Sequence, residues 1–180
     1  MNRVLSILFV GLVAVNFTGC ATYSAHEYSI SADNMATLKE IGDYKVNLGE
    51  FTSTKKGLHS IMCRGAGVIS PPNKITYANY VKNALSQEFK FAERFSATAP
   101  ITLTGNLDKV IFSSNRGIWD FEITLNSTNG KSVAVVDRYD FRTSFFAGRA
   151  CHQVSLNLSN AVKAVIKKLV NHAEFAALVK

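Results

Sequence analysis

Strands are predicted where apolar and polar residues alternate along the chain. Residues 43–53 alternate in this way, which is typical of a strand with one buried face. Alternation resumes over 101–112, with a one-residue change of phase near Asp108 that indicates a β-bulge. From Trp119 to Leu125 the alternation is unbroken. We therefore predict three strands, and we expect the apolar side chains of the third to face the core.

Two helices and a hairpin complete the pattern. Apolar residues recur three or four positions apart over 75–94 and again over 154–170, which predicts two amphipathic helices. The pair Asn129-Gly130 favours the positive φ angles of a type I′ turn. A fourth strand at 133–142 is therefore expected to pair with the third as a hairpin.

The order of these elements predicts the fold class. The segment 54–73, with its Gly65-Ala66-Gly67 triplet, separates the first strand from the first helix and is interpreted as a flexible loop. The remaining order is β-α-β-β-β-α, and amphipathic helices bury their apolar side against a sheet. We predict a two-layer α+β fold, in which an antiparallel sheet of about four strands is covered on one face by two amphipathic helices.

The first twenty residues have the features of a secretory leader. Arg3 gives a positive start, residues 4–15 are apolar, and Gly19 directly precedes Cys20. The apolar segment is shorter than the roughly 20 residues of a membrane-spanning helix. The run ending in Gly-Cys resembles a lipobox with Phe17 in place of the usual Leu, which implies cleavage before Cys20 and lipid acylation of its sulfur and amine. The alternative is ordinary cleavage that leaves Cys20 as a free thiol.

The leader sets the expected organisation of the whole chain. Residues 1–19 are interpreted as a signal peptide and 43–180 as a single α+β domain. The segment 20–42 is rich in Ser, Ala, Thr and Asn, so we expect the lipidated Cys20 to be followed by a tether with a weak helical turn. Ala21 after the cysteine implies, by the lipoprotein sorting rule, an outer-membrane protein that faces the periplasm.

The net charge of +7 adds a candidate class of ligand. A basic balance favours contact with anionic surfaces such as lipid headgroups or lipopolysaccharide phosphates. Nucleic acid is not an expected partner of an extracytoplasmic lipoprotein. The alternative interpretation is that the positive charge serves solubility alone.

With Cys20 assigned to lipid, Cys63 and Cys151 remain as a pair in an oxidising compartment. We expect a disulfide between them, which closes a long loop and stabilises the fold by about 4 kcal/mol. The alternatives are two buried free thiols or a cysteine nucleophile. Histidine spacing fits no metal site, so we expect no bound metal. We also expect no catalytic residue and no cofactor. The four histidines are His26, His59, His152 and His172.

Two groups of residues are candidate contacts with a partner or a lipid. Phe145 and Phe146 lie between Arg142 and Arg149, and this combination of aromatic and basic side chains suits a lipid or protein contact. We favour the more ordinary interpretation, which places both rings at the end of the core beneath the second helix. Lys163 and Lys167 form a basic helix face that could meet phosphates, although a solvated face is the commoner case.

Several segments together resemble a family of uncharacterised proteobacterial outer-membrane lipoproteins. They are the Gly-Cys leader, the Cys-containing loop with prolines before a Tyr-rich helix, the strands starting at Ile101 and Trp119, and the Ala-Cys start of the closing helix. The element order is also similar to that of small envelope-assembly and transport-auxiliary lipoproteins, including the lipopolysaccharide-transport plug.

This resemblance implies a membrane-anchored, non-enzymatic periplasmic protein that binds an envelope partner in assembly or lipid transport. The alternative is a protein that binds anionic lipid or lipopolysaccharide directly through a basic surface. A partner-binding protein is expected to show an exposed apolar patch or a free sheet edge. A lipid-binding protein is expected to show a cavity or a basic patch, and an enzyme a pocket with convergent titratable groups.

Overall fold

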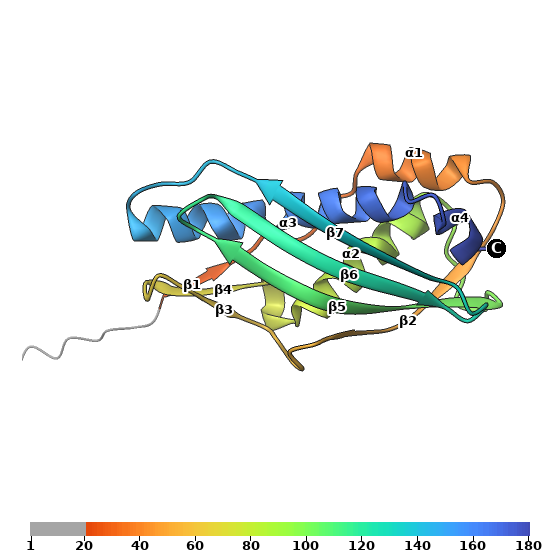
Figure 1. Cartoon of the computed structure of the whole chain (residues 1–180), viewed down its shortest axis with the longest axis horizontal. Helices are drawn as coiled ribbons and strands as arrows, with labels where there is room; N and C mark the ends of the chain where they lie inside the picture. The colour runs from red at the N-terminus through yellow and green to blue at the C-terminus, as the bar shows by residue number, and fades with distance from the viewer. Residues whose placement is uncertain (1–20) are drawn as a thin grey trace, which may run out of the picture.

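Two β-sheets and four α-helices make up residues 21–180, the part of the chain that this computed structural model describes (Figure 1). The predicted leader and Cys20 lie outside the described residues. No helix within 21–180 is long and apolar enough to cross a membrane. The elements, in chain order, are β1 (Ala21–Ser24), α1 (Ala32–Glu40), β2 (Val46–Ser53), β3 (Ile61–Cys63), β4 (Gly67–Ser70), a 3-10 turn (Pro72–Lys74), α2 (Tyr77–Phe91), β5 (Ile101–Ser113), β6 (Ile118–Ser127), β7 (Ser132–Asp140), α3 (Ala147–Val170) and α4 (Phe175–Leu178).

The larger sheet has the strand order β2-β5-β6-β7. β5, β6 and β7 are antiparallel, as predicted, and the bulge near Asp108 is confirmed by a register shift between Leu107 and Lys109. β2, however, pairs with β5 in parallel, so the prediction of a fully antiparallel sheet is wrong. The reason is that α2 connects β2 to β5 as a crossover, and a crossover brings the chain back to the end of the sheet where the first strand began.

The hairpin between β6 and β7 is confirmed, but its turn is longer than predicted. Gly130 has a φ of +84°, whereas Asn129 is not in the positive-φ region. The Gly130 N–H donates to the carbonyl of Ser127 (3.0 Å), and the Ser127 N–H donates to the carbonyl of Lys131 (2.9 Å). This is a three-residue loop with glycine at its left-handed position. The Asn129 side chain instead donates to the carbonyls of Ala177 and Lys180, which ties the C-terminus to the hairpin.

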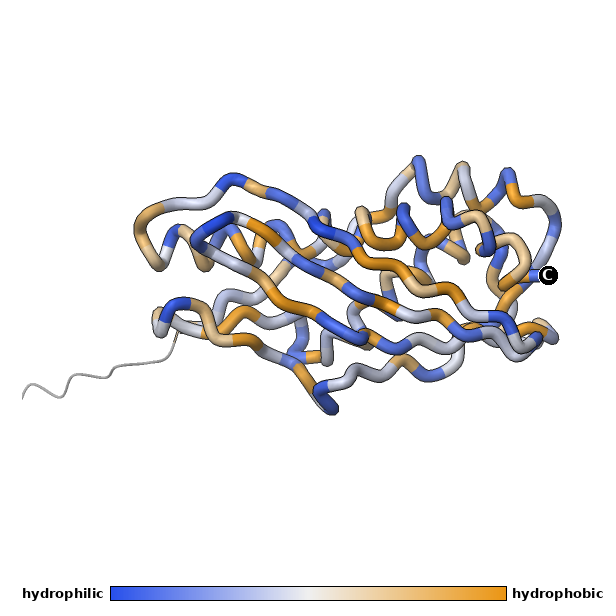
Figure 2. The backbone as a smooth tube through the Cα atoms, viewed as in Figure 1, coloured by the Kyte–Doolittle hydropathy of each residue, from blue (hydrophilic) through white to orange (hydrophobic). Residues whose placement is uncertain are grey.

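Helices α2 and α3 pack on one face of the larger sheet, and the core lies between them and the strands (Figure 1). Figure 2 shows the alternation of hydrophobic and hydrophilic residues along β5, β6 and β7 that produces this buried face. The predicted orientation of the third strand is confirmed, because its apolar side chains are all buried. They are Trp119, Phe121, Ile123 and Leu125.

The smaller sheet, with strand order β1-β4-β3, was not predicted. β3 and β4 form an antiparallel hairpin within 54–73, so the prediction of a flexible loop there is wrong. β1 pairs in parallel with β4, with Ala21 opposite Gly67 and Ser24 opposite Ser70. A Cβ at Gly67 would collide with the carbonyl of Ala21, so only glycine permits this close approach.

The predicted tether at 20–42 is wrong for its described residues, because these are built into the domain. After β1, helix α1 packs against α3 and buries Leu38 completely. The buried carboxylate of Glu88 in α2 accepts hydrogen bonds from the Tyr28 hydroxyl (2.5 Å) and from the Ser31 N–H (2.9 Å). Burial and the neighbouring Glu88 carboxyl raise the pKa of Tyr28 above its ordinary range, so this hydroxyl stays a donor. The folded domain therefore includes residues 21–42 and does not begin at residue 43.

Candidate functional site

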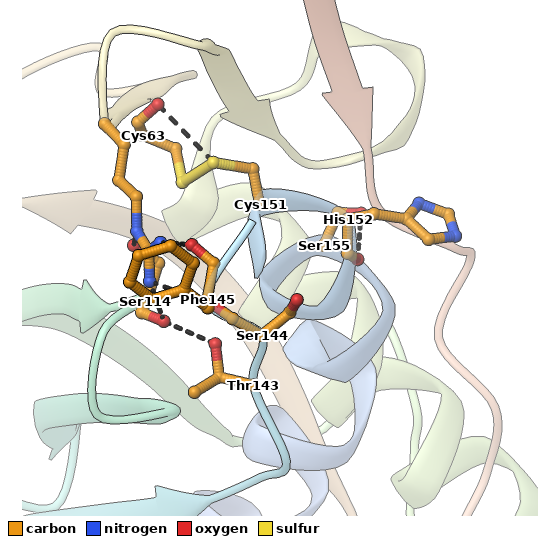
Figure 3. Close-up of a disulfide and its surroundings, with 9 residues drawn as sticks. Cys63, Ser114, Thr143, Ser144, Phe145, Cys151, His152 and Ser155 are labelled. Atoms are coloured by element: carbon orange, nitrogen blue, oxygen red, sulfur yellow. Dashed lines mark hydrogen bonds between the residues drawn. A yellow bond between two sulfur atoms is a disulfide. The ribbon is translucent and has the colours of Figure 1, made fainter. Parts of the chain in front are cut away.

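A disulfide joins Cys63 and Cys151 (Figure 3). The β3–β4 hairpin and the start of α3, which it connects, lie at one end of the domain (Figure 1). Cys63 is the last residue of β3, and Cys151 lies in the first turns of α3. Their Cα atoms are 5.9 Å apart, within the range of about 4.4–6.8 Å for bridged cysteines, and both residues are buried. The predicted pairing is confirmed. It removes the two alternatives of free thiols and a cysteine nucleophile for this pair.

Arg64, which directly follows the disulfide, connects three loops. Its guanidinium donates to the Ser114 hydroxyl (2.9 Å) and carbonyl (2.8 Å) in the β5–β6 loop. It also donates to the Phe145 carbonyl (3.0 Å) in the loop before α3. The Thr143 hydroxyl donates to the same Ser114 carbonyl (Figure 3). These bonds fix the β3–β4, β5–β6 and β7–α3 loops against one another, and we refer to residues 62–64, 114–116 and 142–149 as the tip.

Phe145 and Phe146 are exposed at the tip. Phe145 is 92% exposed and Phe146 is 66% exposed, and their rings meet edge to face with centroids 6.0 Å apart. The expectation that they close the end of the core is therefore wrong. The physical reason is that the buried disulfide fills the space beneath the start of α3, and that Arg64 holds the Phe145 backbone at the surface.

The arginines of the tip surround this aromatic pair. Arg142 and Arg149 line a surface cavity of about 380 Å³ together with Ser144 and His152. Arg64 lines a second cavity of about 420 Å³ with Asn115 and the loop 143–145. The guanidinium carbon of Arg149 also lies 5.8 Å from the centroid of the Phe146 ring. The structure thus brings together four of the predicted contact residues, namely Arg142, Phe145, Phe146 and Arg149.

The two predicted lysines lie elsewhere. Lys167 forms an ion pair with Asp33 of α1 (3.1 Å), and the neighbouring Lys168 pairs with Asp137 of β7 (3.7 Å). Lys163 lies fourteen residues after Arg149 on α3, which corresponds to about 20 Å along the helix. Lys167 therefore joins α1 to α3, and the structure does not bring either predicted lysine to the tip.

The tip differs from the rest of the surface in its charge pairing. Five ion pairs join basic and acidic side chains elsewhere on residues 21–180. Within the same residues, none of the arginines of the tip forms an ion pair with a carboxylate. They are Arg64, Arg116, Arg142 and Arg149. The tip is therefore a local excess of positive charge next to exposed apolar rings.

The acidic groups with shifted pKa values have structural partners away from the tip. Arg138 donates to the carboxylate of Asp120 (2.6 Å) on the open face of the sheet and lowers the pKa of Asp120. Burial raises the pKa of Asp137, which pairs with Lys168. Among residues 21–180, no three His, Cys, Asp or Glu side chains gather as metal ligands would.

A third cavity lies beside the C-terminal half of β2 and reaches Asn106 of β5. It has a volume of about 730 Å³ and is lined by residues 50–54, Lys56 and the start of α2, including Asn79. Its lining is mostly Thr, Ser and Asn, with one carboxylate, Glu50, and one ammonium group, Lys56. This composition suits hydrogen bonding to a partner more than acid–base chemistry.

Comparison with protein-family models gives no match, and no curated protein is significantly similar to this chain. The resemblance to outer-membrane lipoproteins therefore stays a prediction.

Proposed function

We propose that this protein is a lipid-anchored, non-enzymatic protein of the bacterial cell envelope that binds an envelope partner, as an accessory of assembly or lipid transport. The observation that carries the proposal is that the folded domain already includes Ala21, the residue directly after the lipobox cysteine. The anchor at Cys20 and the domain then have no flexible spacer between them. The sorting rule for Ala21 favours the outer membrane, facing the periplasm.

In this proposal, the anchor determines which end of the domain faces the membrane. Consecutive Cα atoms are about 3.8 Å apart, so acyl chains on Cys20 start within one residue of β1. β1 is held by four parallel pairings with β4, and the segment after it is held by Glu88. The domain is therefore presented to the periplasm in a defined orientation, as a partner-binding accessory requires.

Support for a protein partner comes from the outer edge of β2. β2 is the edge strand of the larger sheet, and within residues 21–180 its outer edge is bridged only at Val46, by Phe95. Beyond this bridge the edge borders the 730 Å³ cavity. A free edge next to a groove can accept an extended segment of another protein as an added strand.

Acylation is the first prediction of this proposal. The mature protein is expected to begin at Cys20 and to carry acyl chains, whereas Cys20→Ser leaves an unprocessed precursor without them. Mass spectrometry of the amino terminus and membrane fractionation measure this. A mature amino terminus without acyl chains would contradict the anchor and the localisation.

Partner binding is tested by photo-crosslinking at the β2 edge. A photoreactive residue at Thr52, which is exposed and lines the groove, is expected to give one discrete protein adduct in cells. The matched control carries the same residue at Asn160, an exposed position on α3. Equal adducts at both positions, or none at Thr52, would count against partner binding at this edge.

The alternative function, direct binding of anionic lipid, is favoured by one specific observation, the unpaired arginines of the tip. It is compatible with the anchor, because a lipid-anchored protein can also contact headgroups with its folded domain.

A further inference from the structure

We propose that the tip is a membrane-docking surface, in which Phe145 and Phe146 enter the headgroup region of an anionic bilayer while Arg142 and Arg149 bind lipid phosphates. This inference rests on the proposed anchor at Cys20. It adds a second contact with the same membrane and thereby sets the tilt of the domain.

The tip lies next to the point where the anchor joins the domain. Ala21 pairs with Gly67, and Gly67 pairs with Cys63. Two strand spacings separate Ala21 from Cys63, which corresponds to about 10 Å. Arg64 follows directly and is hydrogen-bonded to the Phe145 carbonyl. Figure 1 shows β1, the β3–β4 hairpin and the start of α3 at the same end of the domain. An anchor that brings Ala21 to the bilayer surface therefore also brings the tip there.

Apolar exposure is concentrated at this end. Phe145 and Phe146 lie side by side in the loop before α3, with their ring centroids 6.0 Å apart. The other large exposed apolar side chains lie singly on β3, α2, β5 and β7. Exposed apolar groups that gather in one place, rimmed by polar residues, mark an interaction site. Amphipathic membrane contacts bury such groups about 5–10 Å into the headgroup and acyl boundary.

The positive charges around the Phe145 and Phe146 rings favour binding to an anionic surface. Arg142 and Arg149 line one cavity with His152, whereas Arg64 is hydrogen-bonded to Ser114 and Phe145 and holds the loops in place. Guanidinium groups bind phosphate oxygens with two parallel hydrogen bonds. Each arginine near an anionic membrane contributes about a fivefold gain in binding.

The tip is also rigid before it meets a membrane. The disulfide joins β3 to α3, and Arg64 joins both to the β5–β6 loop. Loops that are already ordered lose less conformational entropy on binding. This arrangement distinguishes the tip from a flexible basic segment, which would have to order its loops at the bilayer.

The experiment uses the acylated mature protein in vesicles of phosphatidylcholine with or without phosphatidylglycerol, with brominated acyl chains as the quencher. Phe145→Trp places a fluorescent probe at the tip, and the single natural tryptophan, Trp119, is fully buried and gives the background. Phe91→Trp is the matched control, because Phe91 is also exposed and ends α2 near the start of β5. The tip lies at the other end of β5, about 40 Å away.

Brominated lipid is expected to quench the tryptophan of Phe145→Trp and to leave that of Phe91→Trp unchanged. Quenching is expected to increase with phosphatidylglycerol and to weaken when the salt concentration rises from 0.1 to 1 M, which shortens the Debye length from about 10 to about 3 Å. In the Phe145→Trp background, Arg142→Gln with Arg149→Gln is expected to weaken the phosphatidylglycerol-dependent quenching. Lys39→Gln with Lys131→Gln removes the same charge from exposed positions outside the tip and outside the β2 groove, and is expected not to weaken it.

Co-flotation of each variant with the vesicles separates the two proposals. A protein that floats with the vesicles but shows no quenching at position 145 would overturn the docking surface and leave the anchor intact. Quenching that is independent of phosphatidylglycerol and of both arginines would likewise overturn the docking surface and leave the anchor intact. A mature protein without acyl chains would overturn both proposals together.

Discussion

Trp119→Ala is expected to lower the free energy of unfolding by about 3–5 kcal/mol, the range for removal of a fully buried large aromatic side chain. Trp119 is completely buried between β6 and the helices. Its ring contacts those of Phe112 and Phe121, with centroids 5.0 and 5.7 Å away, and that of Tyr77 in α2. Its indole N–H donates to the Val154 carbonyl in α3 (3.0 Å). The variant therefore loses packing on three elements and one buried hydrogen bond.

Urea denaturation followed by far-UV circular dichroism measures this loss. Tryptophan fluorescence cannot be used, because Trp119 is the only tryptophan in the chain. Phe91→Ala is the control, since Phe91 is 60% exposed and its removal is expected to change stability by about 0.5 kcal/mol or less. A loss of only a few tenths of a kcal/mol for Trp119→Ala would be inconsistent with a core position. It would also invert the register assigned to every residue of β6.

The alternation pattern predicted the larger sheet well because each of its strands has one buried and one open face. In β6, Trp119 and Phe121 face the helices, while Asp120 between them pairs with Arg138 on the open face. Period-two patterning records this difference directly. The alternation pattern does not indicate which strands are neighbours. The parallel pairing of β2 with β5, which results from the crossover through α2, was therefore not predicted.

The smaller sheet was missed because its strands are too short to show a period. β1 has four residues and β3 has three, and β1 exists only because β4, more than forty residues later, supplies its hydrogen bonds. Composition rich in Ser, Ala and Thr suggested a tether for the same segment. The polar residue that fixes this segment, Glu88, lies within an amphipathic helix where nothing in the sequence marks it as buried.

The candidate site was predicted in part. The cysteine pair could be inferred from number and compartment, and Phe145 with its flanking arginines could be singled out from composition. Whether the rings point into the core or into solvent depends on how three distant loops meet, which no local pattern records. Arg64 was missed for the same reason. Nothing in the sequence around this arginine indicates that it forms hydrogen bonds with Ser114 and Phe145.

Loss of the disulfide is expected to lower the free energy of unfolding by about 2–5 kcal/mol. The bond joins residues 88 apart in the sequence, so its removal lets the unfolded chain explore far more conformations. Cys63→Ser with Cys151→Ser is the appropriate variant, since both cysteines are buried and a reductant reaches them poorly in the folded protein. Chemical denaturation of the acylated or detergent-bound mature protein measures the change.

Two features make this result diagnostic. When a reductant is present during denaturation, unfolding exposes the disulfide to it, so the reductant is expected to destabilise the wild-type protein and to have no effect on the double serine variant. This comparison separates the disulfide from other effects of the reagent. The bond also positions Arg64, and Arg64 holds the Phe145 loop, so the variant is expected to show faster amide hydrogen exchange at 114–116 and 143–146 than in the hairpin of β6 and β7. Unchanged stability, or free thiols at both positions in the non-reduced protein, would contradict the bridge. Uniform loss of exchange protection across the domain would show that the disulfide stabilises the whole fold without any particular role in ordering the tip.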